Sequence, residues 1–287
     1  MKKTIVALGL VLFGAGAPAV ATAQTGTAAA PVVQVQAADQ SGSPSDRAVN
    51  PSQPDFTLIG LPTTLKMPRF GSAFRVTHRF TRSLGAGDFG DLLSDFFGFD
   101  SGAQIGLEYR FGILPGTQVG VHRTSDRTIQ LFAQHHLIGQ GGSPVGIDVI
   151  GAIDGTNNFR DSYSPSIGAV LSRQIGRHGA VYAQPIWINN TNSLPSELAD
   201  DNDTFMLGLG GRFRVRPTVY VVGEAAPRWG YDPGAVYTSF AIEKRAGGHS
   251  FQINFSNGFG TTLPQIARGG IDHDTWFIGF NISRKFF

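Results

Sequence analysis

The sequence contains no cysteine, and this absence removes three kinds of site at once. A disulfide, a thiolate nucleophile and a thiolate-bound metal centre all need the sulfur of that residue. Long apolar segments are absent as well, because no apolar run after residue 23 approaches the roughly 18 residues that a membrane-spanning helix requires. We therefore expect no helical membrane spans.

Charge is scarce in this chain, and outside one segment it is balanced. Charged residues make up 15% of the chain, with 23 Lys and Arg against 21 Asp and Glu. Two of the lysines lie in residues 1–23, where a basic start, an apolar stretch and Ala21-Thr22-Ala23 predict a signal peptide for export. The remainder then carries no net charge, so the basic isoelectric point gives no support for nucleic-acid binding.

Glycine and aromatic residues are abundant, with 38 Gly and 11% aromatics. Residues 24–54 are nevertheless rich in Ala, Gln, Ser and Pro and contain no aromatic residue. Pro62 and Pro68 interrupt the apolar character of the next stretch. Such a composition buries too little apolar surface to offset chain entropy. We expect residues 24–72 to form a flexible periplasmic segment, followed by one domain over 73–287.

From residue 73 onward the sequence alternates between apolar and polar residues. Leu107 and Tyr109, for example, alternate with Glu108 and Arg110, which is the period of a half-buried strand. Twelve strands are predicted, at 73–81, 103–111, 117–124, 128–137, 145–153, 166–175, 180–188, 204–215, 218–226, 236–243, 249–256 and 275–286.

The connections between these strands alternate between short and long. Tight turns are predicted at 112–116, 138–144, 176–179, 216–217 and 244–248. Long loops are predicted at 82–102, 154–165, 189–203, 227–235 and 257–274, and 125–127 is the one short exception. Short turns on one side and long loops on the other are typical of outer-membrane barrels. The sequence therefore predicts an all-β fold, a closed antiparallel transmembrane β-barrel of about 12 strands with short periplasmic turns and long extracellular loops.

The two faces of the predicted strands differ in polarity. In a membrane barrel the apolar face meets lipid and the polar face lines the interior. The predicted lumen-lining residues are Arg75, Arg79, Glu108, Arg110, Asp148, Arg212, Arg214 and Glu224. Because a charge in a confined space is costly unless it is paired, we expect salt bridges across a narrow lumen.

The chain ends on TWFIGFNISRKFF, a strand that is apolar on one side and closed by phenylalanine. A closing strand of this kind is predicted to serve as the signal for the barrel assembly machinery. Its residues are Trp276, Ile278, Phe280, Ile282, Phe286 and Phe287. The expected surroundings are outer-membrane lipid, since the exported chain would insert in the bacterial outer membrane.

Three stretches of the sequence resemble one known family. They are residues 74–113, 120–134 and 251–262, with the motifs Thr77-His78-Arg79-Phe80 and Phe255-Ser256-Asn257-Gly258. The chain resembles an uncharacterised bacterial "domain of unknown function" family of outer-membrane-type β-barrels over roughly 60–287. The resemblance implies a membrane barrel and brings no activity with it.

The sequence offers few candidates for catalysis or metal binding. In His122-Arg123-Thr124-Ser125-Asp126, strand neighbours point to opposite faces, so the His and the hydroxyls are poorly placed to act together. His135 and His136 are separated in the same way and make a poor chelating pair. Residues 200–203 gather oxygen ligands but lack the Gly and closing Glu of a Ca²⁺ loop. No catalytic residue, metal or cofactor is predicted.

The segment DFGDLLSDFFGFDSG (88–102) contains apolar residues at helical spacing. Two interpretations remain open for it. It folds back as a short helix that constricts or caps the barrel, or it forms a surface loop whose aromatic rings pack on neighbouring loops.

The function that these patterns favour is a narrow passive channel or a structural barrel with a charged lumen, with small solutes as possible cargo. Two alternatives remain. One is an outer-membrane hydrolase, and the other is a soluble periplasmic β-barrel that acts as a binding or scaffold protein.

Overall fold

The computed structural model describes residues 50–99, 101–192 and 203–287. The predicted signal peptide (1–23), residues 24–49 and residues 200–202 lie outside this described part, so the predictions made for them stay predictions.

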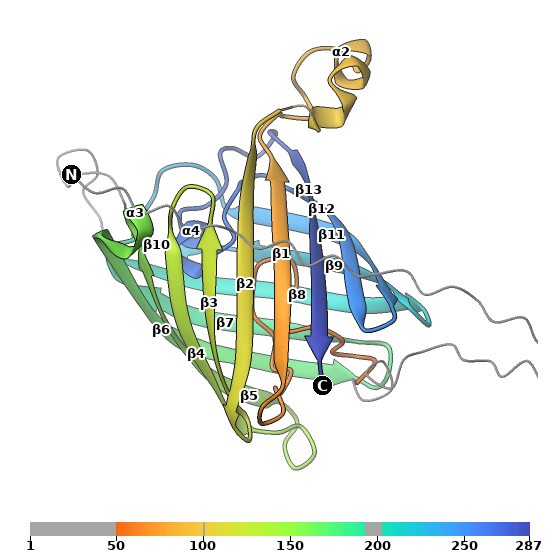
Figure 1. Ribbon diagram of the computed structural model, residues 1–287, viewed down its shortest axis with the longest axis vertical. Helices are drawn as coiled ribbons and strands as arrows, with labels where there is room; N and C mark the ends of the chain where they lie inside the picture. Colours follow the sequence, from red (N-terminus) through yellow and green to blue (C-terminus); the bar gives the residue numbers. More distant parts are fainter. Residues whose placement is uncertain (1–49, 100, 193–202) are drawn as a thin grey trace, which may run out of the picture. The chain divides into compact units, whose positions relative to one another are not determined.

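Twelve long antiparallel strands form one closed barrel (Figure 1). They are β1 (Ser72–Phe80), β2 (Ala103–Leu114), β3 (Thr117–Thr124), β4 (Ile129–Ile138), β5 (Gly146–Gly155), β6 (Asp161–Ile175), β7 (Gly179–Ile188), β8 (Thr204–Arg216), β9 (Val219–Ala226), β11 (Tyr237–Ala246), β12 (His249–Ser256) and β13 (Phe277–Phe286). A two-residue strand, β10 (Arg228–Trp229), extends the pairing of β8. The predicted fold class and strand number are confirmed.

Closure of the barrel depends on pairing between its first and last strands. Every long strand pairs with its neighbour in sequence, and β13 pairs with β1 from Ser72↔Phe286 to Arg79↔Gly279. Because this pairing satisfies the outer backbone groups of both strands, the sheet has no free edge to expose to lipid.

The connections divide between the two ends of the barrel, as Figure 1 shows. Short turns join the strands at the end where the C-terminus lies, and they span 115–116, 139–145, 176–178, 217–218 and 247–248. The connections at the other end span 81–102, 125–128, 156–160, 189–203, 227–236 and 257–276, and most of them are long. The predicted alternation of turns and loops is therefore present in the structure.

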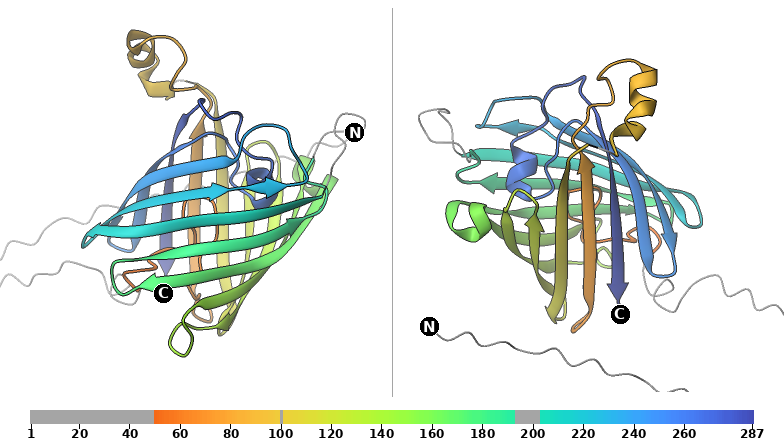
Figure 2. Two further views of the ribbon diagram at one scale, coloured as in Figure 1. Left: turned by 180° about the vertical axis from the view of Figure 1, so that it is seen from behind. Right: turned by 45° about the horizontal axis from the view of Figure 1, so that its top comes forward.

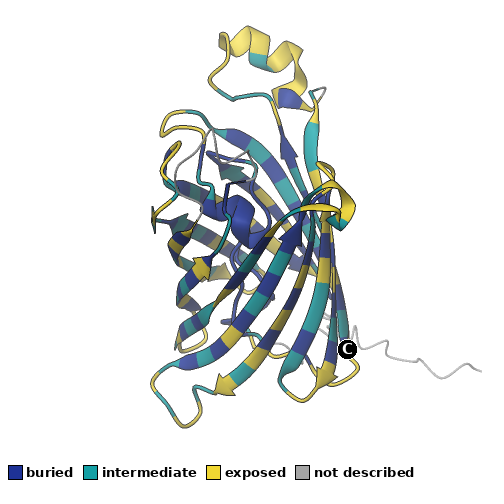
Figure 3. Cartoon of the chain, turned by 90° about the vertical axis from the view of Figure 1, so that its left-hand side faces the viewer, coloured by how far each residue is buried: buried dark blue, intermediate teal, exposed yellow. Residues whose placement is uncertain are grey.

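Side chains alternate between a buried and an exposed face along the strands (Figure 3). The exposed face is apolar: Leu107, Ile167 and Ile253 have exposed fractions of 48%, 63% and 58%. A soluble protein turns such residues inward, whereas a membrane barrel presents them to lipid. Within the described residues, no helix is long and apolar enough to cross a membrane.

The connection from β1 to β2 carries the helix α2 (Phe89–Ser94) and a 3₁₀ turn (Phe96–Gly98). Asp88 caps α2, since its side chain accepts a hydrogen bond from the Asp91 N–H. No residue of α2 is buried, and the loop projects beyond the strands in both views of Figure 2. The interpretation of this segment as a cap or constriction of the barrel is therefore wrong.

Two further short helices lie at the same end. The first, α3 (Thr156–Phe159), follows β5 at the rim. The second, α4 (Leu263–Ala267), belongs to the connection between β12 and β13, and all of its residues are buried. Thr262 caps α4 with a reciprocal pair of hydrogen bonds to Gln265. Its burial places α4 inside the mouth of the barrel, where Figure 3 shows it surrounded by strands.

Residues 52–64 are buried inside the barrel, in contrast to the flexible periplasmic segment expected over 24–72, whereas Lys66 and residues 68–70 are exposed. Leu58, Ile59 and Leu61 have exposed fractions of at most 1%. They join one apolar cluster with inward side chains of β4 to β11 and with Leu263 and Ile266 of α4. The expectation failed because composition was averaged over the segment, whereas a few apolar residues suffice when the barrel supplies the other side of the core.

Candidate functional site

The candidate site is the interior of the barrel together with residues 50–71, which we call the plug. The chain reverses direction at the innermost point of the plug, where the Leu58 N–H donates to the Leu61 carbonyl at 2.8 Å. Thr57 and Pro62 form an isolated bridge across this reversal. The turn leaves several backbone groups of the plug without partners of their own, and the barrel provides those partners.

Glu224 on β9 binds the N–H groups of the turn. Its carboxylate accepts hydrogen bonds from the backbone of Ile59 at 3.0 Å, of Gly60 at 2.8 Å and of Leu61 at 3.1 Å. The hydroxyl of Ser239 donates to the same carboxylate at 3.1 Å. Glu224 thus anchors the plug through three of its backbone N–H groups, and among the described residues it forms no ion pair.

The carbonyl groups of the plug are bound by amide side chains from strands all around the barrel. Gln134 donates to Thr63 at 2.7 Å, Gln184 to Pro62 at 2.8 Å, Gln252 to Leu58 at 3.0 Å and Asn281 to Ile59 at 2.9 Å. These donors come from β4, β7, β12 and β13, so the plug is bound from several sides and through its main chain.

Two arginines connect the plug to the acidic residues of the wall. Arg75 donates to the Thr57 hydroxyl at 2.9 Å and to the Ile59 carbonyl at 3.1 Å, while its other nitrogen pairs with Glu108 at 2.5 Å. Arg212 donates to the Thr57 carbonyl at 2.7 Å and pairs with Glu243 at 2.8 Å. Both guanidinium groups therefore serve a carboxylate and the plug together.

The ion pairs of the interior join nearby strands. Glu108 binds Arg110 two residues along the same strand, as well as Arg75 on the neighbouring strand. Arg212 on β8 and Glu243 on β11 have only β9 between them. The expectation of salt bridges that span the lumen is wrong, because the plug occupies the space between opposite walls.

Asp148 and Arg79, also predicted to line the lumen, are both buried. The carboxylate of Asp148 interacts with His136 at 2.7 Å and accepts from Gln134 at 2.6 Å. Arg79 donates to the side chain of Asn281 at 2.9 Å, and in the described part of the chain it forms no ion pair. Hydrogen bonds from amide side chains thus connect the polar residues of the wall as much as ion pairs do.

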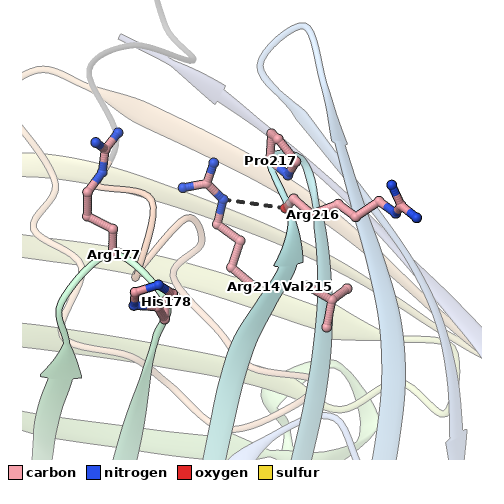
Figure 4. A pocket seen from close by; sticks show the side chains of 6 residues that line it. All are labelled: Arg177, His178, Arg214, Val215, Arg216 and Pro217. Atoms are coloured by element: carbon pink, nitrogen blue, oxygen red, sulfur yellow. Dashed lines mark hydrogen bonds between the residues drawn. The ribbon is translucent and has the colours of Figure 1, made fainter.

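Arg214 lies at the rim and not in the interior, so its prediction as a lumen-lining residue is wrong. It borders an open hollow of about 460 Å³ beside the short turns, together with Arg177, His178 and Arg216 (Figure 4). Its Nε donates to the Arg216 carbonyl at 3.4 Å. At this position water solvates the charge, since the strand has passed the end of the barrel.

The outer end of the plug is fixed to the closing strand. The carboxylate of Asp55 accepts a hydrogen bond from the Ser283 hydroxyl and lies 3.8 Å from the Lys285 ammonium. The ring of Phe56 packs edge-on against Phe287, with 6.3 Å between centroids. Phe287 therefore faces the plug, whereas Phe286 is 49% exposed on the outer surface. The other predicted assembly residues, Trp276, Ile278, Phe280 and Ile282, are partly exposed.

The plug meets α4 in the middle of the barrel. A Cβ added to Gly60 would lie 2.7 Å from Ile266 Cδ1, and one added to Gly208 would lie 3.0 Å from Leu61 Cδ1. A larger residue at either position would therefore require the neighbouring side chain to shift. Internal cavities near the plug measure only about 10 and 20 Å³, at most room for a single water. The plug and α4 together therefore fill the interior.

The residues considered for catalysis remain apart. His122 is buried in the interior, 3.7 Å from Glu108, while Ser125 is exposed and hydrogen-bonds with the backbone of Ile105. His135 is exposed beside Thr117, and His136 points inward to Asp148. No cluster of three or more metal-ligating side chains occurs among the described residues.

A closed barrel with an apolar outer wall and a polar, side-chain-filled interior defines a membrane β-barrel protein. A family model described as "Membrane bound beta barrel domain (DUF5777)" matches residues 55–286, and the chain belongs to that family. The resemblance noted from the sequence is confirmed. The matched region begins at Asp55, so most of the plug is part of the family's domain.

Two solved structures align with this chain at low sequence identity. The NanC porin aligns with a TM-score of 0.51 and 6% identity over 76% of this chain and 99% of its own. An outer-membrane channel from Pseudomonas putida F1 aligns with a TM-score of 0.48 and 11% identity over 78% of this chain and 98% of its own. Likeness at this level concerns the fold alone. No curated protein matches the sequence.

Proposed function

We propose that this protein is a bacterial outer-membrane channel for small solutes that is closed at rest by the plug and α4. The observation that carries the proposal is the way the plug is bound. It is held through its main chain by side chains of the wall, and these hydrogen bonds can exchange for water without disrupting any strand pairing. A removable segment inside an intact barrel is the arrangement that a closed channel requires.

In this proposal the short turns are periplasmic and the long connections are extracellular. Residues 1–23 act as the export signal, and the closing strand is bound by the barrel assembly machinery. Arg75, Arg79, Glu108, Arg110, Asp148, Arg212 and Glu224 line the passage once the plug has moved. The apolar outer surface supports a membrane location over a soluble scaffold, and membrane fractionation separates the two. No catalytic residue is proposed.

A structural barrel that never conducts is the second candidate. The apolar cluster that the plug forms with the wall favours it. Fully burying a side chain such as Leu58, Ile59 or Leu61 stabilises a fold by about 1.5–3 kcal/mol, an upper estimate here because the unfolded chain is itself partly collapsed. Several such residues make displacement of the plug costly, and a permanently filled barrel is then stable without any transport role.

Planar-bilayer conductance distinguishes the two candidates. The refolded full chain should show low conductance with rare openings, and a variant lacking residues 50–66, which removes the surface on which Ile266 of α4 packs, should conduct continuously. Both samples are first checked for a heat-modifiable folded form on gels. If the deletion variant inserts as a closed barrel and still carries no current, the protein is a structural barrel.

A disulfide that locks the plug provides the matched test, because the chain has no other cysteine. A Cβ at Gly60 would lie 3.7 Å from Ile266 Cγ1, the atom whose place a cysteine sulfur would take, so the variant Gly60→Cys/Ile266→Cys brings two thiols together for oxidation. Oxidation should abolish the rare openings and reduction should restore them. The frequency of openings in either single-cysteine variant should not depend on the redox state. Openings that persist in the oxidised double variant would show that current does not depend on plug movement.

A further inference from the structure

A polar pocket of about 310 Å³ opens at the loop end of the barrel, outside the plugged interior. Its walls come from the start of β2, from the turn between β3 and β4, and from the long connection between β12 and β13. The polar side chains that line it are Gln104, Asp126, Gln265 and Arg268, and Phe259 and several backbone groups of glycine complete the wall.

Asp126 supplies negative charge to the pocket. Although burial alone would raise its pKa, hydrogen bonds from the Thr124 hydroxyl and the Thr128 N–H lower the pKa of this carboxyl below its usual value. Gln265 donates to the second oxygen at 3.0 Å. The carboxylate is thus ionised and held in place, and this second oxygen has lone pairs left for a further donor.

Arg268 supplies the opposite charge. Its Nε donates to the Thr191 carbonyl at 2.8 Å, which fixes the guanidinium plane. Its Nη2 is buried and has no hydrogen-bond partner in the described part of the chain. An unpaired buried donor costs free energy, and because Nη2 has no surface open to the pocket, the guanidinium must shift slightly to offer it to a ligand oxygen. Arg268 and Asp126 line the same pocket and, among the described residues, form no salt bridge with each other.

From this arrangement we infer that the pocket is a binding site for a small zwitterion such as a free amino acid, whose carboxylate binds Arg268 and whose ammonium binds Asp126. A fixed cation and a fixed anion that do not pair with each other match a ligand that carries both charges. The volume admits a molecule of this size. Sugars lack the ionic groups that the two side chains select.

The inference rests on the proposed function only for the role of the pocket, which would be to concentrate solute at the entrance of the channel. Binding itself requires no conduction. Absence of current in the bilayer experiments would not affect the binding site. Absence of binding would leave the proposed channel without a selective site at its entrance.

Isothermal titration of the refolded full chain with glycine and with L-serine tests the site. Both should bind saturably. Acetate, methylammonium and glucose, each of which lacks one or both charges, should bind at least tenfold more weakly. The inference is overturned if neither zwitterion binds saturably, or if acetate binds as tightly as they do. This test needs no variant.

Two substitutions in the wall and one control locate the binding. Asp126→Asn keeps an acceptor for the Thr128 N–H, and Arg268→Gln keeps a donor for Thr191, so both should fold. Each should weaken glycine binding at least tenfold. Asp272→Asn changes an exposed acid of the same connection that does not line the pocket, and it should bind as the wild type does. Unchanged affinity in Asp126→Asn would place the ligand elsewhere.

Discussion

Glu224 and Glu108 show two different ways to keep a carboxylate inside the barrel. Glu224 accepts hydrogen bonds from three backbone N–H groups and a hydroxyl, all of them neutral. Glu108 binds two guanidinium groups, those of Arg75 and Arg110. The first carboxylate therefore binds the plug, and the second binds the wall of the barrel. Their removal should have different consequences.

Replacing Glu224 by Ala should release the plug. Three backbone N–H groups would lose their acceptor, and each buried unsatisfied donor costs about 1–3 kcal/mol, so a loss on the order of 3 kcal/mol or more is expected. Urea unfolding in vesicles measures the loss, and protease cleavage within 50–71 reports the release. Glu224→Gln, which keeps an acceptor, should have a stability between those of the wild type and Glu224→Ala. A plug as resistant in Glu224→Ala as in the wild type would contradict its role as anchor.

Replacing Glu108 by Ala should destabilise the barrel itself. Two buried guanidinium groups would lose their counter-charge, and breaking a buried pair typically costs about 3–5 kcal/mol. The measurement is the same urea titration. Asp232→Ala, which removes an exposed acid of a loop, should change stability by less than about 0.5 kcal/mol. Equal stabilities of these two variants would mean that water screens the interior charges.

At the scale of elements, the plug behaves as a bound peptide whose site is the barrel. It adds no strand to the sheet, and many of its hydrogen bonds run from side chains of the wall to its own main chain. Its outer end is fastened by β13, through Ser283, Lys285 and Phe287. The final strand therefore combines closure of the barrel with retention of the plug.

Substitutions at the last two residues should distinguish closure of the barrel from retention of the plug. Phe286 faces outward and Phe287 packs on Phe56. Phe286→Ala should lower the fraction of protein that inserts in membranes, as measured by heat-modifiability. Phe287→Ala should insert normally but lose an aromatic contact of about 1 kcal/mol, and its plug should be cleaved faster by protease. The same defect in both variants would mean that the residues act as one assembly signal.

At the scale of the whole molecule, the chemistry differs between the two ends of the barrel. The turn end carries the exposed Arg177 and Arg216, and the loop end carries the polar pocket and the projecting α2. A solute that arrives from the loop side meets the pocket first and then α4, and the plug lies deeper. Orientation in the membrane thus decides which of these features faces the outside of the cell.

Epitope tags on intact cells should reveal that orientation. Tags at 232 and 273, in exposed loops, should be labelled, and tags at 178 and 247, in short turns, should be labelled only after the outer membrane is opened. Position 265, which looked suitable from the sequence alone, lies in the buried helix α4 and would disrupt the mouth. Labelling of all four tags on intact cells would contradict a periplasmic location of the turns.

Sequence reasoning identified the strands because their signals are local. The alternation around Leu107 and Tyr109 repeats every two residues, and turn residues mark the ends of most strands, so strand number and pairing order followed without tertiary information. The polar face also followed, since Arg75, Glu108 and Arg212 share the parity that the structure buries. Arg214 was misassigned because parity says which face a residue takes and not how far along the barrel it lies.

The sequence by itself determined a closed barrel with an apolar wall, because strand period, turn composition and loop length are all properties of neighbouring residues. Only the tertiary structure decided what fills that barrel. Glu224 binds Gly60 across 164 positions, and Asn281 binds Ile59 across 222. Contacts of that separation leave no periodic pattern, and a segment bound through its main chain by distant side chains carries no strand signal of its own. The plug could therefore be recognised only in the tertiary structure, where the strands that bind it surround it.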